Sequence, residues 1–309
     1  MQESGGELSG INRKLLGIAQ AAKTLSVKKD LRLFGRISRP LVSFLMFSSN
    51  PILPQLTANE DNCRAFLLDL GIPLKDPFTE QWLSYEDLPQ EQKKALTSAL
   101  IVHLSSYGVE EWKIKELVGE VYTLTKEAPK SPLRDAKEFA TMLNSCGRHG
   151  KPEVALAVCM GDRKDEYGKA LALLAEHREA LRKGIEFIQQ HGIEERKSFY
   201  FFDAGKEIQD SLVGIIAGML YGSIIQENKP IIALARSEDG SVKVSGRGTS
   251  YLVRRGLNIG QALKEIGAEM AGVEGGGHRI AAGAKVNEDK LGDFLARLEK
   301  KFSEQLGAQ

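Results

Sequence analysis

The sequence of 309 residues is poor in cysteine and contains no Cys-x-x-Cys pair. Its three cysteines, Cys63, Cys146 and Cys159, are widely spaced, which argues against a disulfide framework or a zinc knuckle and fits a reducing cytoplasm. No apolar run is long enough to span a bilayer, and the first ten residues lack the basic and apolar regions of a secretory signal. These absences predict a cytoplasmic protein without a membrane partner.

An excess of charge of one sign is also missing, because 42 Lys and Arg residues stand against 41 Asp and Glu residues. The net charge of +1 therefore does not by itself indicate nucleic-acid binding. One segment differs, since residues 241–256 contain no acid and four basic residues, Lys243, Arg247, Arg254 and Arg255. Such a strip suits phosphate, although a solvated strand and loop would explain it equally well.

The N-terminal half shows short helical patterns that prolines interrupt. Residues 10–25 form the first, Asn59 can cap a helix that ends near Leu70, and Pro89 opens another. The helix after Pro89 carries three leucines on one face: Leu96, Leu100 and Leu104. A third apolar stripe, at residues 112–121, completes the pattern of a small helical insertion.

A long helix is predicted from about Lys164 to Gln190, because its apolar residues recur every three to four positions. Gly192 is a suitable C-cap, and the helix has the character of a connector between two domains. His177 lies near the apolar stripe and has no second ligand at i+3 or i+4. We therefore expect it to be a core or boundary residue and not a metal ligand.

After Gly192 strands and helices alternate. The run SFYFFDA has the character of a strand, a helix with small residues on one side follows, and two β-rich runs flank Asp239-Gly240, which signals a hairpin. A helix at about residues 258–271, the strand IAAGAKV and a closing amphipathic helix complete the pattern. This order predicts a compact α/β domain.

The sharpest local signal is the glycine run Gly275–Gly277, which His278 follows. Without β-carbons, the three glycines would let backbone amides approach an anion, and the histidine could donate to a phosphoryl oxygen. Ala281, Ala282 and Gly283 would let a strand pack tightly under this loop. The residues alone fit a phosphate loop and a plain glycine turn about equally well.

The run VSGRGTSYLVRRGLNIGQALKEIGAEMAGVEGGGHRIAAGAKV resembles the DHHA1 domain, which has a Ser-x-Arg at the end of a strand, a helix and then GGGHxxAAG. The resemblance implies that Arg247 and His278 contact the substrate phosphate and act in catalysis. It also implies that further residues line the same pocket: Ser245, Gly275, Gly276, Gly277, Ala282 and Gly283.

A second segment, NSCGR at residues 144–148, resembles the NAAGR motif of RecJ proteins. The resemblance implies that Asn144 and Arg148 brace the active-site edge or touch phosphate. A helix that ends at Gly147, with Arg148 near the negative end of the helix dipole, would also explain the segment. GINRKLL and LFGRISRPLVSFLMFSSNP are likewise similar to archaeal RecJ-like proteins, the GINS-associated nucleases, so the resemblance covers essentially the whole chain.

The metal-binding motifs of DHH enzymes are missing from this sequence. There is no Asp-x-Asp near the start and no Asp-His-His, and the five histidines lack acidic neighbours at ligand spacing. We therefore expect no metal site in this chain and no nuclease activity from it alone. The resemblance implies manganese or magnesium for a complete protein, of which this chain would be a fragment, a split-gene product or a late start.

The resemblance implies an α/β protein in which a mainly helical region precedes a mixed-sheet DHHA1 domain. The predicted order is a DHH-domain remnant (1–44), a helical insertion for partner docking (45–130), the end of the DHH domain (131–163), a connector helix (164–192) and the DHHA1 domain (193–309). The implied partners are single-stranded DNA or RNA, the GINS complex through the insertion, and a separate DHH half.

Three functions remain open from the sequence. The first is the nucleic-acid-binding part of a RecJ-like exonuclease that hydrolyses single-stranded DNA or RNA. The second is a nuclease-inactive replication scaffold, because the superfamily includes a nuclease-dead subunit of the eukaryotic replicative helicase. The third is a phosphodiesterase for small oligonucleotides or cyclic dinucleotides, which shares the DHHA1 domain but usually lacks such an insertion.

Overall fold

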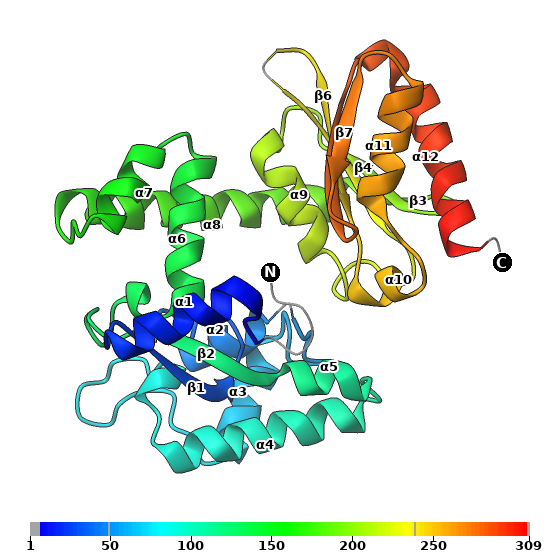
Figure 1. Cartoon of the computed structure of the whole chain (residues 1–309). Coiled ribbons are helices and arrows are strands. Elements are labelled where there is room, and N and C mark those ends of the chain that lie inside the picture. Colours follow the sequence, from blue (N-terminus) through cyan, green and yellow to red (C-terminus); the bar gives the residue numbers. More distant parts are fainter. Residues whose placement is uncertain (1–6, 49, 238, 308–309) are drawn as a thin grey trace. The chain divides into compact units, whose positions relative to one another are not determined.

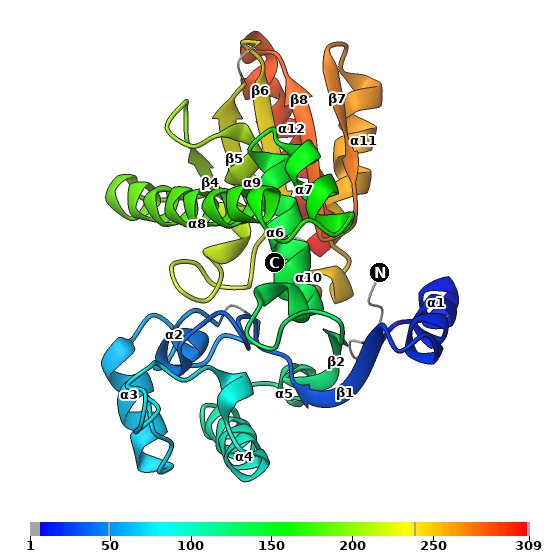
Figure 2. The ribbon, with the colours of Figure 1, turned by 90° about the vertical axis from the view of Figure 1, so that its left-hand side faces the viewer.

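The computed structural model describes residues 7–48, 50–237 and 239–307 (Figure 1). The chain forms two compact units, residues 1–145 and 146–309, and the division falls within helix α6 (Ala136–Arg148). Figure 2 shows the same ribbon turned by 90°. Among the described residues, no helix is both long and apolar enough to cross a membrane.

The first unit combines helices with a two-stranded antiparallel sheet. Strand β1 (Leu25–Leu31) pairs with β2 (Val118–Leu124), and the register runs from Leu25 opposite Leu124 to Leu31 opposite Val118. Five helices precede α6: α1 (Gly10–Ala21), α2 (Leu41–Met46), α3 (Glu60–Asp69), α4 (Gln90–Ser106) and α5 (Glu111–Glu116). Two 3₁₀ turns, Tyr85–Asp87 and Pro132–Arg134, complete the described part of the unit.

Helices α3 and α4 follow the sequence prediction. The Asn59 side chain accepts a hydrogen bond from Asn62 N and caps α3, and Pro89 precedes the first residue of α4. The three leucines of α4, Leu96, Leu100 and Leu104, are fully buried in the core of this unit. Their side chains thus belong to the core of the unit itself.

The third apolar stripe, at residues 112–121, was predicted as a helix, and that prediction is wrong for its second half. Helix α5 ends at Glu116, and Val118 begins strand β2. Valine, tyrosine and threonine in β2 favour an extended backbone, and pairing with β1 settles the choice. Residues 118–124 are thus part of a sheet. A deletion of residues 50–128 would remove β2 and leave β1 without its partner strand.

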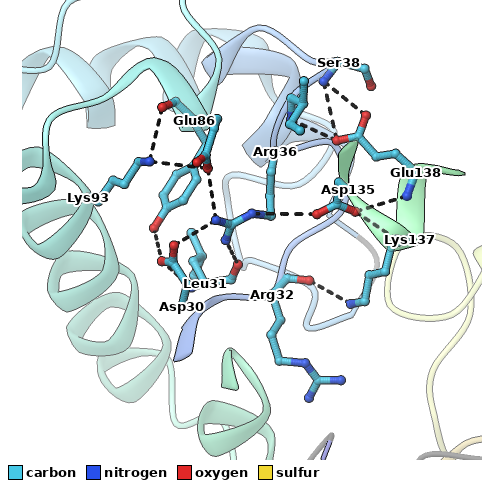
Figure 3. A network of polar contacts seen from close by, with 12 residues as sticks. Asp30, Leu31, Arg32, Arg36, Ser38, Glu86, Lys93, Asp135, Lys137 and Glu138 are labelled. Carbon is cyan, nitrogen blue, oxygen red and sulfur yellow. Dashed lines mark hydrogen bonds and ion pairs between the residues drawn. The ribbon is translucent and has the colours of Figure 1, made fainter. Parts of the chain in front are cut away.

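Arg36 is the centre of a buried polar network in this unit (Figure 3). Its guanidinium donates to Asp30 Oδ2 at 2.8 Å, to Glu86 Oε2 at 3.2 Å and to the Leu31 carbonyl. Although burial opposes the shift, the hydrogen bond from Arg36 lowers the pKa of Asp30. The network therefore fixes the end of β1 against the turn that precedes α4.

Glu138 ties the start of α6 to the segment after Arg36 (Figure 3). Its carboxylate accepts hydrogen bonds from the backbone of Ile37 at 2.8 Å and of Ser38 at 3.1 Å. Burial raises the pKa of Glu138, and these backbone donors oppose that shift. The first turn of α6 is consequently held by the same polar core.

The second unit contains a mixed six-stranded sheet with the order β3-β4-β5-β6-β8-β7. Its strands are β3 (Glu194–Glu195), β4 (Tyr200–Asp203), β5 (Ile231–Arg236), β6 (Val242–Arg247), β7 (Val273–Gly277) and β8 (Ala281–Val286). Strands β4 and β5 are parallel, and all other pairs are antiparallel. The predicted hairpin around Asp239-Gly240 is confirmed as the β5–β6 connection, and the α/β fold class with its mixed sheet is confirmed as well.

Helices cover the two faces of this sheet differently (Figure 1). Helices α11 (Ile259–Glu269) and α12 (Leu291–Leu306) pack on one face, in a core with Val242, Val244 and Ala284. Helix α9 (Asp210–Met219) packs on the other face, against Ile231 and Ala233 of β5.

The remaining helices of this unit are α7 (Pro152–Cys159), α8 (Asp165–His191) and α10 (Ser250–Arg254), with a 3₁₀ turn at Glu288–Lys290. Helix α8 is the predicted long helix and ends at Gly192, which has a φ of +82°. His177 on α8 is buried, as predicted from its place near the apolar stripe.

Candidate functional site

The glycine run is the end of strand β7, so neither the predicted loop nor the alternative of a plain glycine turn is correct for its backbone. In β7, Gly275 pairs with Ala284, Gly276 with Gly283 and Gly277 with Ala282. The turn of this hairpin begins only at His278. The reason is packing: a Cβ on Gly275 would lie 3.1 Å from Leu263 Cβ of α11, and one on Gly277 would lie 2.7 Å from Ala282 Cα. Glycine is therefore needed where α11 and β8 approach β7 closely.

Strand alternation separates the predicted pocket residues into two groups. Gly275, Gly277 and Ala282 face the core beneath α11, where Ala282 is buried. Gly276 and Gly283 face the opposite side of the sheet, and a Cβ added to Gly276 would meet nothing within 4 Å. Only the second group lies on the same face as Ser245 and Arg247, the face on which α9 packs.

Arg247 lies in a groove that two glycines of α9 provide. A Cβ on Gly214 would stand 3.0 Å from Arg247 Cζ and still closer to Nη2, whereas one on Gly218 would lie 3.9 Å from Arg247 Cγ and Cδ. The guanidinium donates to the Gly246 carbonyl at 2.7 Å. Since glycine is costly inside a helix, these two positions mark the close approach of the arginine to α9.

Arg148 reaches the same helix from the end of α6. Its Nη1 donates to the Ser211 carbonyl in the first turn of α9. Burial lowers the pKa of Arg247, and the nearby Arg148 charge lowers it further. Within the described ranges, no carboxylate is paired with either guanidinium. Two guanidiniums without a paired carboxylate therefore lie against α9.

Ser245 adds a hydroxyl to this site. It is only 5% exposed, and a Cβ at Gly214 would lie 3.1 Å from its Oγ. Among the residues that the structure describes, its side chain has no hydrogen-bond partner. This hydroxyl is therefore free to donate a hydrogen bond to a bound acceptor.

His278 begins the β7–β8 turn and is exposed. Its backbone N–H donates to Ala281 O at 2.9 Å, and Ala281 is the register partner of Arg247. His278 and Arg247 thus both lie next to Ala281 of β8, at the same end of the sheet.

The segment at residues 144–148 forms the last turns of α6. The helix continues through Gly147 and ends at Arg148, so the prediction that it ends at Gly147 is wrong; Gly150 is the residue with a positive φ, at +68°. Asn144 is exposed and belongs to the first unit. Arg148 alone of this motif is placed beside Arg247.

Sequence reasoning missed Gly214 and Gly218 as parts of the site. Their signal was present, because two glycines four residues apart lie on one helix face and each costs roughly 1 kcal/mol relative to alanine. In the predicted helix they were noted only as small residues. The sequence does not show that β6 passes next to this helix, so it did not indicate that Arg247 fills the space beside the two glycines.

A metal site does not form from the residues that the structure describes. They contain no group of three or more His, Cys, Asp or Glu side chains that could hold an ion. His149 and His177 lie edge to face, with ring centroids 5.9 Å apart, but they do not complete such a group. The side chains described here therefore do not fit the two-metal centre that the family resemblance implies.

Two domain families match the chain. A DHH-CID domain matches residues 33–118, and a DHHA1 domain matches residues 197–304. An uncharacterised protein of Methanocaldococcus jannaschii is 30% identical over 300 residues, which cover 97% of this chain and 60% of that protein. The chain thus spans less than two thirds of the length of this curated relative.

Solved structures with some similarity include CDC45 from Entamoeba histolytica, at 13% identity and a TM-score of 0.49, over 91% of this chain and 58% of that one. RecJ in complex with Mg²⁺ from Thermus thermophilus has 21% identity and a TM-score of 0.43, over 55% of this chain and 25% of that one. With a DHH-CID domain in its first half and a DHHA1 domain in its second, the chain belongs to the DHH/DHHA1 superfamily.

Proposed function

We propose that this chain is the substrate-binding part of a phosphodiester hydrolase that acts on single-stranded DNA or RNA. The proposed site binds a terminal phosphate beside α9, on the face of the DHHA1 sheet that carries Ser245 and Arg247. Arg247 and His278 contact the phosphate, Arg148 adds positive charge, and Ser245 donates a hydrogen bond.

The observation that carries this proposal is the pair of guanidiniums, from β6 and α6, that lie against α9. Arg247 is half-buried, and within the described residues its guanidinium donates only to a neighbouring carbonyl. Arg148 is likewise held by a carbonyl and not by a carboxylate. Placing two cations together costs free energy in the empty site, and a phosphate with three acceptor oxygens would offset that cost.

The proposed chemistry of these residues is orientation and charge stabilisation. In a phosphodiester hydrolysis, negative charge grows on the phosphoryl oxygens as water attacks, and fixed donors such as Arg247 and His278 stabilise it. The described residues do not fit the metal ions that would activate the water. The proposal for this chain is therefore phosphate binding, and cleavage by a complete protein is a separate expectation.

Binding of a 5′-mononucleotide, followed by calorimetry, tests the proposal. Arg247→Ala is expected to weaken binding about tenfold to a hundredfold, because one charged contact to phosphate is worth roughly 1.5–3 kcal/mol. Arg297→Ala is the matched control, since Arg297 lies on α12 and pairs with Asp293 and Glu269. Equal binding by wild type and Arg247→Ala would refute the proposed function.

A further inference from the structure

We infer that the first turn of helix α11 sets the position of His278, and that Gly260 in this turn is a positioning residue for the phosphate contact. The inference rests on the proposed function, because it takes His278 as a ligand of the terminal phosphate. Phosphate affinity is thus expected to depend on a helix residue that has no side chain of its own.

The position of His278 is set by its backbone. The side chain is exposed, and within the described residues no other side chain holds its imidazole. Directly before it, Gly277 has a φ of +140°, which residues with a side chain rarely adopt. The chain turns at this point, so the place of the histidine depends on what fixes the turn between β7 and β8.

Helix α11, which lies beside β7 (Figures 1 and 2), binds this turn through the amides of its own first turn. Gly260 N donates to the His278 carbonyl at 3.2 Å, and Ile259 N donates to the Arg279 carbonyl at 3.0 Å. The first amides of a helix have no partner inside the helix, so they are available to hold another segment. Two successive peptide groups of the β7–β8 turn are thereby fixed to the start of α11.

The far side of the turn is fixed to the end of β6. Gly248 N donates to the Ile280 carbonyl at 2.8 Å, and Gly248 directly follows Arg247, the last residue of β6. The turn therefore has hydrogen bonds both to α11 and to the segment that carries Arg247. Because α11 supplies two of these three bonds, a displacement of the turn from α11 would move His278 relative to Arg247.

Gly260 permits the close approach of the turn to α11. A Cβ on Gly260 would lie 2.7 Å from Gly277 C and 3.1 Å from His278 O, and closer still to Gly277 O. These are backbone atoms, so the turn itself would have to move. Since glycine is unfavourable inside a helix, its place here reflects the contact with the turn and not the stability of α11.

Asn258 stabilises the same turn of the helix. Its side chain accepts a hydrogen bond from Gln261 N at 3.1 Å and caps α11. Loss of this cap would loosen the first turn of the helix, and with it the two amides that hold His278 and Arg279. It is a milder change than a Cβ at Gly260, because it brings no new atom against the backbone.

Binding of thymidine 5′-monophosphate to the full chain, followed by calorimetry, tests the inference. Gly260→Ala is expected to weaken binding about tenfold to a hundredfold, because small displacements of a contacting group are costly. Gly267→Ala is the matched control on α11, since a Cβ there would lie 3.1 Å from Val273 O at the start of β7, and it should keep wild-type affinity. In NMR spectra, the imidazole signals of His278 should respond to the nucleotide in the wild type and the control, but not in Gly260→Ala.

A second variant covers the case in which Gly260→Ala does not fold, as thermal unfolding would show. Asn258→Ala is expected to weaken binding about twofold to fivefold, because it frays the first turn of α11. Asn258→Asp keeps an acceptor for the cap and should bind as the wild type does. Asn59→Ala removes the corresponding cap of α3 and should leave binding unchanged.

The outcomes separate the inference from the proposed function. If His278→Ala and Arg247→Ala both bind the nucleotide as the wild type does, the proposed function falls. If His278→Ala weakens binding while a folded Gly260→Ala binds normally or keeps the response of His278, the positioning role of α11 is overturned. Equal losses in Gly260→Ala and Gly267→Ala, or wild-type binding by Asn258→Ala, also overturn it.

Discussion

Gly214→Ala is expected to abolish most phosphate binding although it replaces no polar side chain. The added methyl would stand 3.0 Å from Arg247 Cζ and closer still to Nη2, which is tighter than real Cβ contacts allow. The obstructed group is the end of a flexible side chain, so Arg247 moves out of its groove while the helix stays in place. The substitution therefore acts on the position of the guanidinium.

The magnitude follows from the contact that is lost. Moving Arg247 away from the phosphate should cost about 1.5–3 kcal/mol, or about tenfold to a hundredfold in affinity. Stability should not fall, because alanine favours a helix interior over glycine by roughly 1 kcal/mol. A purely destabilising substitution would instead lower both the phosphate affinity and the stability of the protein.

The assay is mononucleotide binding by calorimetry together with thermal unfolding of each variant. Gly218→Ala is the control on the same helix face, since its methyl would lie 3.9 Å from Arg247 Cγ and Cδ, an ordinary contact. It should gain similar helix stability and keep wild-type affinity. The double variant Gly214→Ala/Arg247→Ala should bind no worse than Arg247→Ala, because both substitutions remove the same contact.

Two results would refute this reasoning. Wild-type affinity in a folded Gly214→Ala protein would mean that the position of Arg247 on α9 is not needed for phosphate binding. Equal losses in the Gly214 and Gly218 variants would mean that α9 as a whole had shifted.

The other predictions concern nuclease activity, His278, the core of the first unit and Asp30. The purified chain should show no manganese-dependent nuclease activity, and release of nucleotides from a labelled single strand that EDTA abolishes would contradict this. His278→Ala should weaken nucleotide binding about tenfold to a hundredfold, measured by calorimetry, with thermal unfolding unchanged because the side chain is exposed. Leu100→Ala should lower the unfolding free energy in urea by roughly 2–5 kcal/mol, because Leu100 is fully buried; a loss below about 1 kcal/mol would contradict its place in the core. Asp30→Asn should cost roughly 1–3 kcal/mol at neutral pH, measured by urea unfolding. Because the folded-state pKa of Asp30 is lowered, its contribution is present above the unfolded-state pKa and lost as the pH falls, so the two proteins should converge in acid.

Local sequence patterns determined much of the second unit. The turn residues Asp239-Gly240 predicted the β5–β6 hairpin, and the apolar spacing before Gly192 predicted α8 and its end. Asn59 and Pro89 likewise marked the starts of two helices of the first unit. These features depend on a few adjacent residues, and caps, turns and amphipathic spacing act over such short distances.

Tertiary structure decided what the glycine run and the stripe at residues 112–121 become. Glycine has low strand propensity, yet Gly275–Gly277 form the end of β7, where α11 and β8 lie too close to Gly275 and Gly277 for a side chain. Val118 to Leu124 leave the helical pattern because β1, far earlier in the chain, pairs with them. Local propensity could not reveal either partner.

The sequence by itself placed Ser245, Arg247, the glycines and His278 in one neighbourhood, because their order matches a known domain. Only the folded sheet decided which of them share a face. Alternation along β7 and β8 turned Gly275, Gly277 and Ala282 toward α11, and left Gly276 and Gly283 on the side of Arg247. The face that a strand residue occupies depends on the register and on which helices cover each side, and both are set by contacts between distant segments.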